Sequence, residues 1–285
     1  MRSLIVDEKF DKKKLNSFIL YNFKSLNPNT LYKALRKKDI KINGKRVSEN
    51  VTLSLGDSID IYITDDLLFS NLNIDIIYED DNILIANKPN NLEVTGDNSL
   101  TSILKEKYAF ISPCHRLDRN TCGLVLFAKN NFALEYLLDK FKNHQIEKHY
   151  LCHVYGIPKK NTDILEAYLF KDSSKSMVYI SDLPKKGYLK IITEYNIIKK
   201  CNDNTCILDI NLHTGRTHQI RAHLAHIGCP IIGDGKYGVN EINKKYNSKT
   251  QKLVSYKIKF NFAKDGSLLD YLSGKEFANN INNFN

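Results

Sequence analysis

The sequence lacks the features that mark membrane-spanning and secreted proteins. No apolar run approaches the ~18 residues that a helix needs to cross a bilayer. The segment from Met1 to Glu8 is apolar over too short a stretch for a signal peptide and turns acidic at once. The six cysteines include no Cys-x-x-Cys pair, so we expect reduced thiols and no disulfide framework. These absences predict a cytoplasmic globular protein that does not associate with membranes.

Two further patterns are missing, and each excludes a class of fold or site. The chain has no internal repeat and no regular alternation of strands and helices, which argues against a parallel α/β sheet. Four histidines lie close together in sequence (His213, His218, His223 and His226), but the zinc-hydrolase pattern His-Glu-x-x-His is absent. On a helix His218 and His223 would lie on different faces, and no acidic residue accompanies them. We therefore predict no metal site.

Charge is present in excess and is unevenly distributed. The chain carries a net charge of +10. Residues 1–62 hold 13 basic and 7 acidic side chains, a net +6, so more than half of the excess lies in about a fifth of the chain. A general enrichment in lysine would spread this charge evenly. The asymmetry instead predicts a polyanionic partner and favours nucleic acid.

The first 63 residues have the pattern of a small α+β domain. Apolar residues recur at helical spacing at 15–19 and again at 31–35, where Pro28-Asn29-Thr30 marks the start of the second helix. Asn43-Gly44 predicts a β-hairpin, and alternating isoleucines at 59–63 predict a further strand. Six basic residues crowd the second helix and the hairpin: Arg36, Lys37, Lys38, Lys41, Lys45 and Arg46. Residues 64–72 lack periodicity and are interpreted as a linker.

Residues 73–285 have the pattern of a larger α+β domain with a mixed or antiparallel sheet. Strands are predicted at residues 74–78, 83–86, 148–155, 187–197 and 206–212. Helices are predicted at 134–141 and from Thr217 to Gly228, where glycine is the expected terminator. The whole chain is therefore expected to be a two-domain α+β protein.

One loop concentrates charged groups directly before an apolar run. It is His115-Arg116-Leu117-Asp118-Arg119-Asn120-Thr121-Cys122-Gly123-Leu124. Its cationic neighbours are expected to keep the Asp118 carboxylate ionised at neutral pH. An ionised carboxylate at the mouth of a buried strand can act as a nucleophile or a base, although an ordinary surface salt bridge would give the same pattern.

Three other segments carry polar side chains in groups. The strand at residues 83–86 leads into Asn87-Lys88-Pro89, and Glu147-Lys148-His149-Tyr150 opens another strand. The third segment is His213-Thr214-Gly215-Arg216-Thr217-His218-Gln219-Ile220-Arg221-Ala222-His223, and Gly228-Cys229-Pro230-Ile231-Ile232-Gly233-Asp234 follows it. An arginine held on a helix offers a fixed bidentate fork to a carboxylate, and a tyrosine offers a flat apolar face with one polar group.

In their order and spacing, these segments resemble the RluA-type pseudouridine synthases, which isomerise uridine within RNA. The resemblance covers residues 74 to about 240 and implies that family's catalytic fold. It implies that Asp118 is the catalytic carboxylate, that Tyr150 packs against the target base and takes up its ring proton, and that Arg221 pairs with Asp118. No metal or organic cofactor is implied, because the reaction has no redox step.

The N-terminal segment resembles the S-four-type RNA-binding module. The matching residues run from Leu31 through Asn43-Gly44-Lys45-Arg46-Val47 to Gly56-Asp57. Family members with this module often act on large-subunit ribosomal RNA, and others modify transfer RNA. We therefore expect a monomeric enzyme whose partner is RNA, with ribosomal RNA as the first candidate.

Five residues are candidates for substrate contact, and each has a structural alternative. Arg116 would fill the space that the extruded base leaves or grip a phosphate, or it forms a plain salt bridge. Leu117 and Ile220 would line the uracil pocket or belong to the core. His115 and Lys88 would contact phosphate or hold the fold by hydrogen bonds.

Two other functions remain open on the sequence alone. One is a non-catalytic RNA-binding or ribosome-assembly factor on the same fold. The other is a nucleoside glycosidase, which would need a second carboxylate near Asp118. Asp139 and Glu147 are nearest in sequence, but the first falls within a predicted helix and the second precedes Tyr150.

Three positions depart from the family pattern. Asn90-Asn91 stands where a small residue and glycine usually follow Lys-Pro. Cys122 replaces the more usual serine in the Asp118 loop, and Leu253-Val254-Ser255-Tyr256 differs from the common His-Ala-containing strand. None of these changes involves Asp118, Tyr150 or Arg221, but they leave open which RNA is bound.

Overall fold

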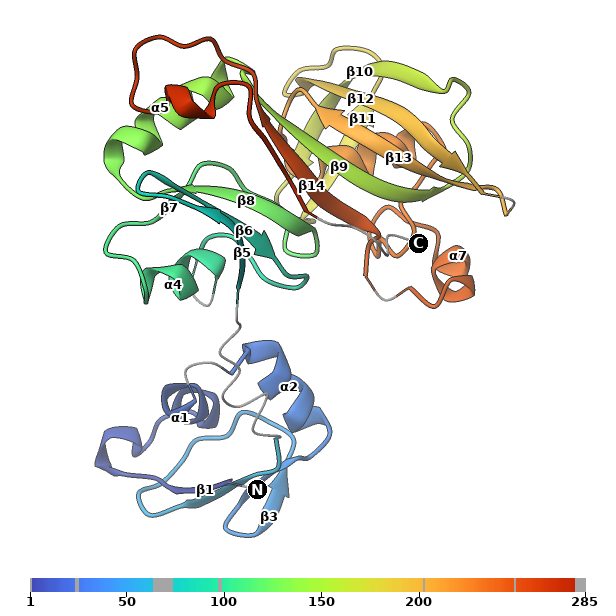
Figure 1. The fold of residues 1–285 in the computed structure, drawn as a ribbon. Helices are drawn as coiled ribbons and strands as arrows, with labels where there is room; N and C mark the ends of the chain where they lie inside the picture. Colours follow the sequence, from blue (N-terminus) through green and yellow to red (C-terminus); the bar gives the residue numbers. More distant parts are fainter. Residues whose placement is uncertain are drawn as a thin grey trace. The chain divides into compact units, whose positions relative to one another are not determined.

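The computed structural model describes residues 2–23, 26–63, 74–96, 99–201, 203–248 and 250–279. The chain divides into two compact units, residues 1–73 and 74–285 (Figure 1). The segment that the sequence predicts as a linker, 64–72, lies outside the described residues. No described helix has both the length and the apolar character needed to span a membrane.

The N-terminal unit packs two helices against a four-stranded antiparallel sheet. Its helices are α1 Leu15–Asn22 and α2 Pro28–Arg36, and a short 3₁₀ turn covers Glu8–Phe10. Its strands are β1 Arg2–Ile5, β2 Ile40–Ile42, β3 Lys45–Val47 and β4 Ser58–Ile61, in the order β1-β4-β2-β3. Fully buried leucines and isoleucines from both helices and the sheet make the core. Both helices and the hairpin are as predicted; the edge strand β1 was not, because three of its four residues are exposed and give no alternation.

Local chemistry explains the boundaries of α2 and of the hairpin. The side chain of Asn27 caps α2 by accepting a hydrogen bond from the Asn29 N–H, and Pro28 occupies the first helical position. The cap is therefore one residue earlier than the Pro28-Asn29-Thr30 signal suggested. At the hairpin, Asn43 and Gly44 both have positive φ, 49° and 77°. This is the conformation that favours Asn-Gly in a two-residue hairpin turn.

The second unit is built on one large, mostly antiparallel sheet. Its described strands are β5 Asp75–Glu79, β6 Ile83–Lys88, β7 Ser112–Pro113, β8 Cys122–Ala128, β9 Ile146–Tyr155, β10 Thr162–Asp172, β11 Met177–Ser181, β12 Leu189–Lys200, β13 Thr205–Leu212, β14 Leu253–Phe260 and β15 Glu276–Ala278. The order is β11-β10-β12-β13-β9-β14-β8-β6-β5, with β15 added to β14 and β7 to β8. Among these pairs only β14 and β8 run parallel, so the sheet is mixed, as predicted.

Strands β6 and β8 are buried on both faces. Alternate residues of β8 point into two different apolar clusters, Val125 and Phe127 into one, Leu124 and Leu126 into the other. This explains why the segment is a continuous apolar run and not an alternating one. The loop that carries Asp118 enters β8 from its N-terminal end, so that loop is anchored to the most buried part of the sheet.

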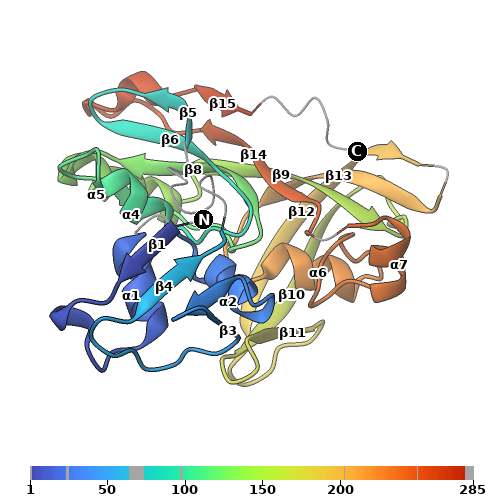
Figure 2. The ribbon, with the colours of Figure 1, turned by 90° about the horizontal axis from the view of Figure 1, so that it is seen from below.

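Four described helices flank this sheet: α4 Leu100–Lys105, α5 Asn131–Lys142, α6 Gln219–His226 and α7 Asn240–Lys245. Helix α6 packs against β11 and β12 (Figure 2). It starts two residues later than the sequence predicts, because His218 has a left-handed conformation and becomes the residue before the first turn. It ends where predicted, before Gly228 with φ 80°.

The parallel contact between β8 and β14 requires glycine. Gly123 has φ 111°, and a β-carbon there would lie 2.1 Å from the carbonyl oxygen of Ser255. No other residue allows the two backbones to come this close. Asp118 lies five residues before this point, so the glycine helps to set the path of its loop.

Candidate active site

The Asp118 loop, strand β9 and the segment leading into α6 line one cavity of about 640 Å³. Asp118, Tyr150 and Arg221 all contribute to its wall, although 103 residues separate the first from the last. The structure therefore brings together the three residues for which the sequence predicts a catalytic role.

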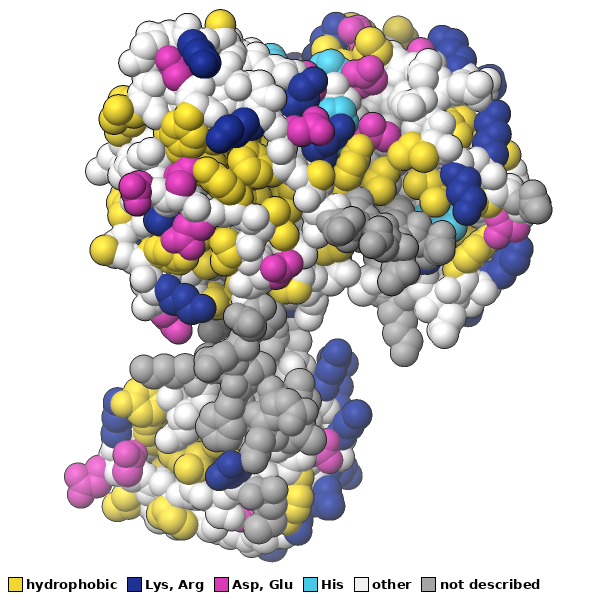
Figure 3. Space-filling model, in the orientation of Figure 1, with side chains coloured by type: hydrophobic (Ala, Val, Ile, Leu, Met, Phe, Trp, Pro, Cys, Tyr) yellow, Lys and Arg dark blue, Asp and Glu magenta, His cyan; other side chains and the backbone are white. Residues whose placement is uncertain are grey.

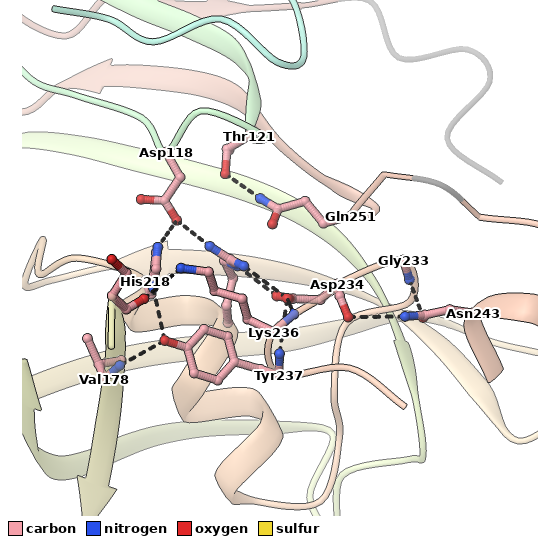
Figure 4. A network of polar contacts seen from close by, with 12 residues as sticks. Asp118, Thr121, Val178, His218, Gly233, Asp234, Lys236, Tyr237, Asn243 and Gln251 are labelled. Carbon is pink, nitrogen blue, oxygen red and sulfur yellow. Dashed lines mark hydrogen bonds and ion pairs between the residues drawn. The ribbon is translucent and has the colours of Figure 1, made fainter. Parts of the chain in front are cut away.

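The Asp118 carboxylate has two nitrogen neighbours on one oxygen. Arg221 Nη1 lies 3.1 Å from Oδ2, and His218 Nε2 lies 4.0 Å from the same atom (Figure 4). The Asp118 side chain is 25% exposed, so a ligand in the cavity can reach it. The predicted pairing of Arg221 with Asp118 is present.

Arg221 is fixed in place by a second, fully buried carboxylate. Its Nε and Nη2 donate to Asp234 at 2.6 and 2.9 Å, which leaves Nη1 for Asp118. Although burial alone would raise the pKa of Asp234, the hydrogen bonds and charge of Arg221 lower it below its ordinary value. Asp234 also accepts from the N–H groups of Lys236 and Tyr237 at 2.8 and 3.1 Å. The guanidinium is therefore held rigidly, and the bidentate contact lies on the side away from Asp118.

The Asp118 loop is held by three polar contacts. Thr121 N–H donates to the Asp118 carbonyl at 3.0 Å and closes a turn. The Thr121 hydroxyl accepts from Gln251 Nε2 at 2.6 Å (Figure 4). Lys88 Nζ donates to the Arg119 carbonyl at 3.1 Å. These contacts keep the carboxylate aimed into the cavity.

Tyr150 projects into the cavity from β9 and is only 3% exposed. Burial, and then the negative charge of Asp118, raise the pKa of its phenol well above the ordinary value. The hydroxyl is therefore protonated at neutral pH. In this state Tyr150 offers an aromatic face and a hydrogen-bond donor, and it is a poor acceptor for a proton.

The other predicted substrate contacts divide into two groups. Arg116 is exposed at the cavity, and Leu117 and Ile220 form apolar wall, 8% and 5% exposed. His115 also borders the cavity, but its Nε2 accepts a hydrogen bond from the Leu126 N–H at 3.1 Å. Burial, and the nearby charge of Lys148, lower the pKa of His115 to about 3, so it is neutral. A neutral, hydrogen-bonded imidazole has a structural role and is not suited to binding phosphate.

Lys88 takes the structural one of its two predicted roles, and it does not line the cavity. Lys88 is fully buried, and its ammonium donates to the carbonyls of Pro89, Leu92 and Arg119 at 3.0, 2.7 and 3.1 Å. Its hydrogen bonds connect the loop after β6 to the Asp118 loop. The same loop explains one departure from the family pattern: Asn91 has φ 65°, and asparagine tolerates this left-handed conformation better than most residues.

Of the cations that line the cavity without carboxylate partners, sequence reasoning identified only Arg116. Within the described ranges, Arg116, Lys142, Lys148 and Arg216 border the cavity and none of them forms an ion pair. Lys148 Nζ lies over the ring of Phe141 at 4.8 Å, and burial lowers its pKa to about 8. Four uncompensated cations around one cavity favour a polyanionic ligand.

The histidines in and just after the segment from His213 to His223 each face a different polar group. His213 pairs with Glu194 at 2.8 Å and His226 with Asp182 at 2.8 Å, while His223 Nδ1 meets the Thr193 hydroxyl at 3.0 Å. The expectation that no acidic residue accompanies these histidines is therefore wrong, because acids that are distant in sequence contact them in the fold. The acids are nevertheless separate, and no three potential ligands converge on a metal position in the part of the chain that the structure describes.

The two acids considered for a glycosidase have other surroundings. Asp139 lies on α5 and accepts from Asn143 at 3.0 Å. Glu147 borders the cavity, where Asn261 donates to it and His149 lies 3.4 Å away. A third carboxylate, that of Asp234, does lie next to the Asp118–Arg221 ion pair. It is buried and is itself paired with Arg221.

Comparison with known proteins agrees with this geometry. Residues 82–226 match the RNA pseudouridylate synthase family. A ribosomal large subunit pseudouridine synthase C of Buchnera aphidicola is 33% identical over 90% of this chain and 88% of its own length. An uncharacterised RNA pseudouridine synthase of Mycoplasma capricolum is 33% identical over 98% of both chains. In fold, the human RNA pseudouridylate synthase domain containing 4 matches 73% of this chain and 89% of its own, with a TM-score of 0.59 and 19% identity.

The order of the motifs, the shared cavity and the extent of these matches lead to one assignment. The chain belongs to the RNA pseudouridylate synthase family and is an enzyme that isomerises uridine in RNA to pseudouridine.

Proposed function

We propose that Asp118 is the catalytic carboxylate of this enzyme and that its substrate is large-subunit ribosomal RNA. The observation that carries the first part is the ion pair between Asp118 and Arg221 at the wall of the cavity. Arg221 occupies only Oδ2, so Oδ1 is left for the nucleotide. An anchored, partly exposed carboxylate of this kind is suited to act on one extruded sugar.

The isomerisation breaks the bond from the ribose C1′ to N1 of uracil, turns the base, and joins C1′ to C5. C5 then loses its proton and N1 gains one, so that the product is an isomer of uridine. Asp118 either attacks C1′ or removes a proton from C2′, and both require a free, ionised oxygen. The base stays in the cavity throughout, where Leu117 and Ile220 provide apolar wall and Tyr150 an aromatic face. In the enzyme without RNA, the raised pKa of Tyr150 keeps its phenol protonated. This state favours packing against the base over uptake of the proton from C5.

The target base must leave its helical stack before it can enter the cavity, at a cost of a few kcal/mol. Arg116 is exposed beside Leu117 and has the length to occupy the vacated space or to bind a phosphate. The unpaired cations Lys142, Lys148 and Arg216 surround the same opening and are suited to the phosphates on either side of the extruded nucleotide. RNA binding and extrusion of the target base would thus use cations that form no ion pair with a carboxylate among the described residues.

The geometry also argues against the non-catalytic RNA-binding factor that the sequence alone left open. Such a protein has no need for a buried carboxylate that holds an arginine against a second carboxylate. The contacts of Asp234, Arg221 and Asp118 are instead what a reacting site needs, because they fix the direction of one charged group. These contacts therefore support a catalytic role for Asp118.

The choice of ribosomal RNA is supported by the relatives of this chain. Those from Buchnera aphidicola and Rickettsia typhi are both named ribosomal large subunit pseudouridine synthase C. Pseudouridines should be mapped across total RNA from cells with and without this protein. We expect loss of one or more pseudouridines in large-subunit ribosomal RNA. If they disappear only from transfer RNA, the proposed substrate is wrong.

We propose that the N-terminal unit is an S-four-type RNA-binding domain that docks the enzyme on its substrate. In Figure 3 the Lys and Arg side chains of this unit gather along the flank of α2 and β3. The six predicted RNA-binding residues belong here, and among the described residues none of them pairs with a carboxylate: Arg36, Lys37, Lys38, Lys41, Lys45 and Arg46. Tyr62, 38% exposed, lies between Lys41 and Arg46, 5.0 and 5.8 Å from its ring centre. Cations beside an exposed aromatic face suit a nucleic acid strand.

Neutralising this flank should weaken RNA binding in a salt-dependent way. In the triple variant Lys41→Gln, Lys45→Gln, Arg46→Gln, we expect the slope of log affinity against log salt concentration to fall by about 2–3 units, since each phosphate contact contributes about 0.7–0.9. The matched control neutralises three exposed lysines beside α1: Lys12→Gln, Lys13→Gln, Lys14→Gln. Equal slopes for the two triple variants would show that the α2–β3 flank is not the docking surface.

A further inference from the structure

His218 is a second group aimed at the Asp118 carboxylate, and the mechanism above leaves it without a role. Its Nε2 lies 4.0 Å from Oδ2, the oxygen that also receives Arg221. Figure 4 shows the His218 imidazole directed toward the Asp118 carboxylate. At 4.0 Å the imidazole is just beyond hydrogen-bond range. A shift of about 1 Å when RNA fills the cavity would close the contact, as active-site hydrogen bonds often do.

The hydroxyl of Tyr237 determines which nitrogen of His218 carries the proton. The Tyr237 oxygen accepts a hydrogen bond from the Val178 N–H at 2.9 Å and lies 2.9 Å from His218 Nδ1. Burial raises the pKa of Tyr237, so the phenol keeps its proton to donate. Burial also lowers the pKa of His218, so the imidazole is neutral and has one N–H. With Tyr237 donating to Nδ1, that N–H must be on Nε2, where it faces Asp118.

The alternative tautomer would place a lone pair against a carboxylate. If Nδ1 carried the proton, the unprotonated Nε2 would face the Oδ2 of Asp118, and the two would repel. The tautomer with Nε2–H makes both contacts of the ring attractive. The hydrogen bonds around the ring therefore select one protonation state of His218.

The backbone of His218 is held in an uncommon conformation that aims this ring. Its φ and ψ are 54° and 15°, in the left-handed region that residues with a β-carbon rarely adopt. The next residue, Gln219, is buried and fixes the segment: its Nε2 donates to the Ile192 carbonyl and its Oε1 accepts from the Arg216 N–H. Strained backbone that its surroundings hold in place is concentrated at functional sites.

We propose that His218 is a positioning residue for Asp118, and that Tyr237 positions His218 by fixing its tautomer. Arg221 and His218 together hold Oδ2, so that Oδ1 is the oxygen presented to the ribose. The proposal rests on the proposed catalytic role of Asp118. His218 thereby adds a hydrogen-bond donor that is neutral in the working enzyme and becomes charged in acid. The other ionisable groups around its ring are Asp118, Arg221, Asp234, Lys236 and Tyr237.

Two amide substitutions of His218 separate this role from simple packing. In His218→Gln the side-chain nitrogen can take the place of Nε2, whereas in His218→Asn it takes the place of Nδ1. We expect His218→Gln to keep kcat within about threefold and His218→Asn to lose about tenfold or more, with KM for RNA within about twofold in both. Equal activity of the two variants would overturn the proposal.

The tautomer itself can be measured on the free protein without RNA. Nitrogen-15 NMR of histidine side chains should show His218 protonated at Nε2 and unprotonated at Nδ1. In Tyr237→Phe the two tautomers should mix and kcat should fall several-fold, whereas Tyr195→Phe, which removes a hydroxyl bonded to the Lys160 carbonyl, should change neither. A proton found on Nδ1 in the wild type would overturn the proposal. Wild-type activity in Asp118→Asn would instead overturn the proposed role of Asp118, and the NMR result does not depend on turnover.

Discussion

Replacing Asp118 by asparagine is expected to lower the rate of uridine isomerisation by ~10³-fold or more. Asparagine has the same shape and keeps an oxygen for Arg221 Nη1, but it carries no charge and can neither attack C1′ nor take a proton from C2′. RNA affinity should stay within a few-fold, because phosphate contacts supply most of the binding. Single-turnover release of tritium from C5 of labelled uridine measures the rate, and filter binding measures the affinity.

The fold should survive this substitution, and a matched control is available. Arg221 keeps its two hydrogen bonds to Asp234, so no buried charge loses its partner. Asp139→Asn removes a carboxylate that accepts from Asn143 on α5, and it should leave the rate at the wild-type value. A near-normal rate in Asp118→Asn would show that another group does the chemistry.

The elements that sequence patterns predict well are those whose signals are local. The hairpin at Asn43-Gly44 follows from two residues that tolerate positive φ, and α5 follows from apolar residues at helical spacing. Strands β10 and β11 were not predicted, and for β10 the reason is physical. On β10, Leu169 is buried and its neighbour Phe170 is 37% exposed, so apolar residues face both sides and no alternation shows.

The active site divides along the same line. The Asp118 loop and the α6 segment are dense in charged residues, so each could be identified from sequence, and the family resemblance paired them. That Lys88 is buried while Lys148 borders the cavity could not be predicted, because both lysines lie near strand ends, where the sequence pattern does not say which way a side chain turns. The roles of His218, Asp234 and Tyr237 depend on contacts that only the folded sheet creates, such as the hydrogen bond from Val178 on β11 to Tyr237.

Removing the guanidinium of Arg221 is expected to damage both stability and activity. In Arg221→Met the fully buried carboxylate of Asp234 loses its counter-charge and two hydrogen bonds, so we expect the free energy of unfolding to fall by about 3–5 kcal/mol. Asp118 loses its 3.1 Å partner in the same step, so isomerisation should also fall by ~10²-fold or more. Urea unfolding at pH 7 measures the first effect, and tritium release the second.

The pH dependence of this loss follows from Asp234. In the wild type its pKa is lowered, so its stabilisation is present above the ordinary aspartate pKa, about 3.9, and is lost as the pH falls through the lower folded value. In Arg221→Met burial is no longer opposed by the arginine and raises the pKa, so the cost of the buried charge decreases as Asp234 takes up a proton. The stability difference between wild type and variant should therefore narrow from pH 7 toward pH 4. A gap that stays constant over this range would contradict the buried-charge explanation.

A double variant separates the two consequences of losing Arg221. Arg221→Met combined with Asp234→Asn removes both buried charges and should recover much of the lost free energy of unfolding, because an unpaired buried charge costs more than a neutral amide. Activity should not recover, since nothing restores the contact to Asp118 Oδ2. Recovery of isomerisation together with stability would mean that Arg221 only holds the fold, and that Asp118 does not need the charge of the guanidinium.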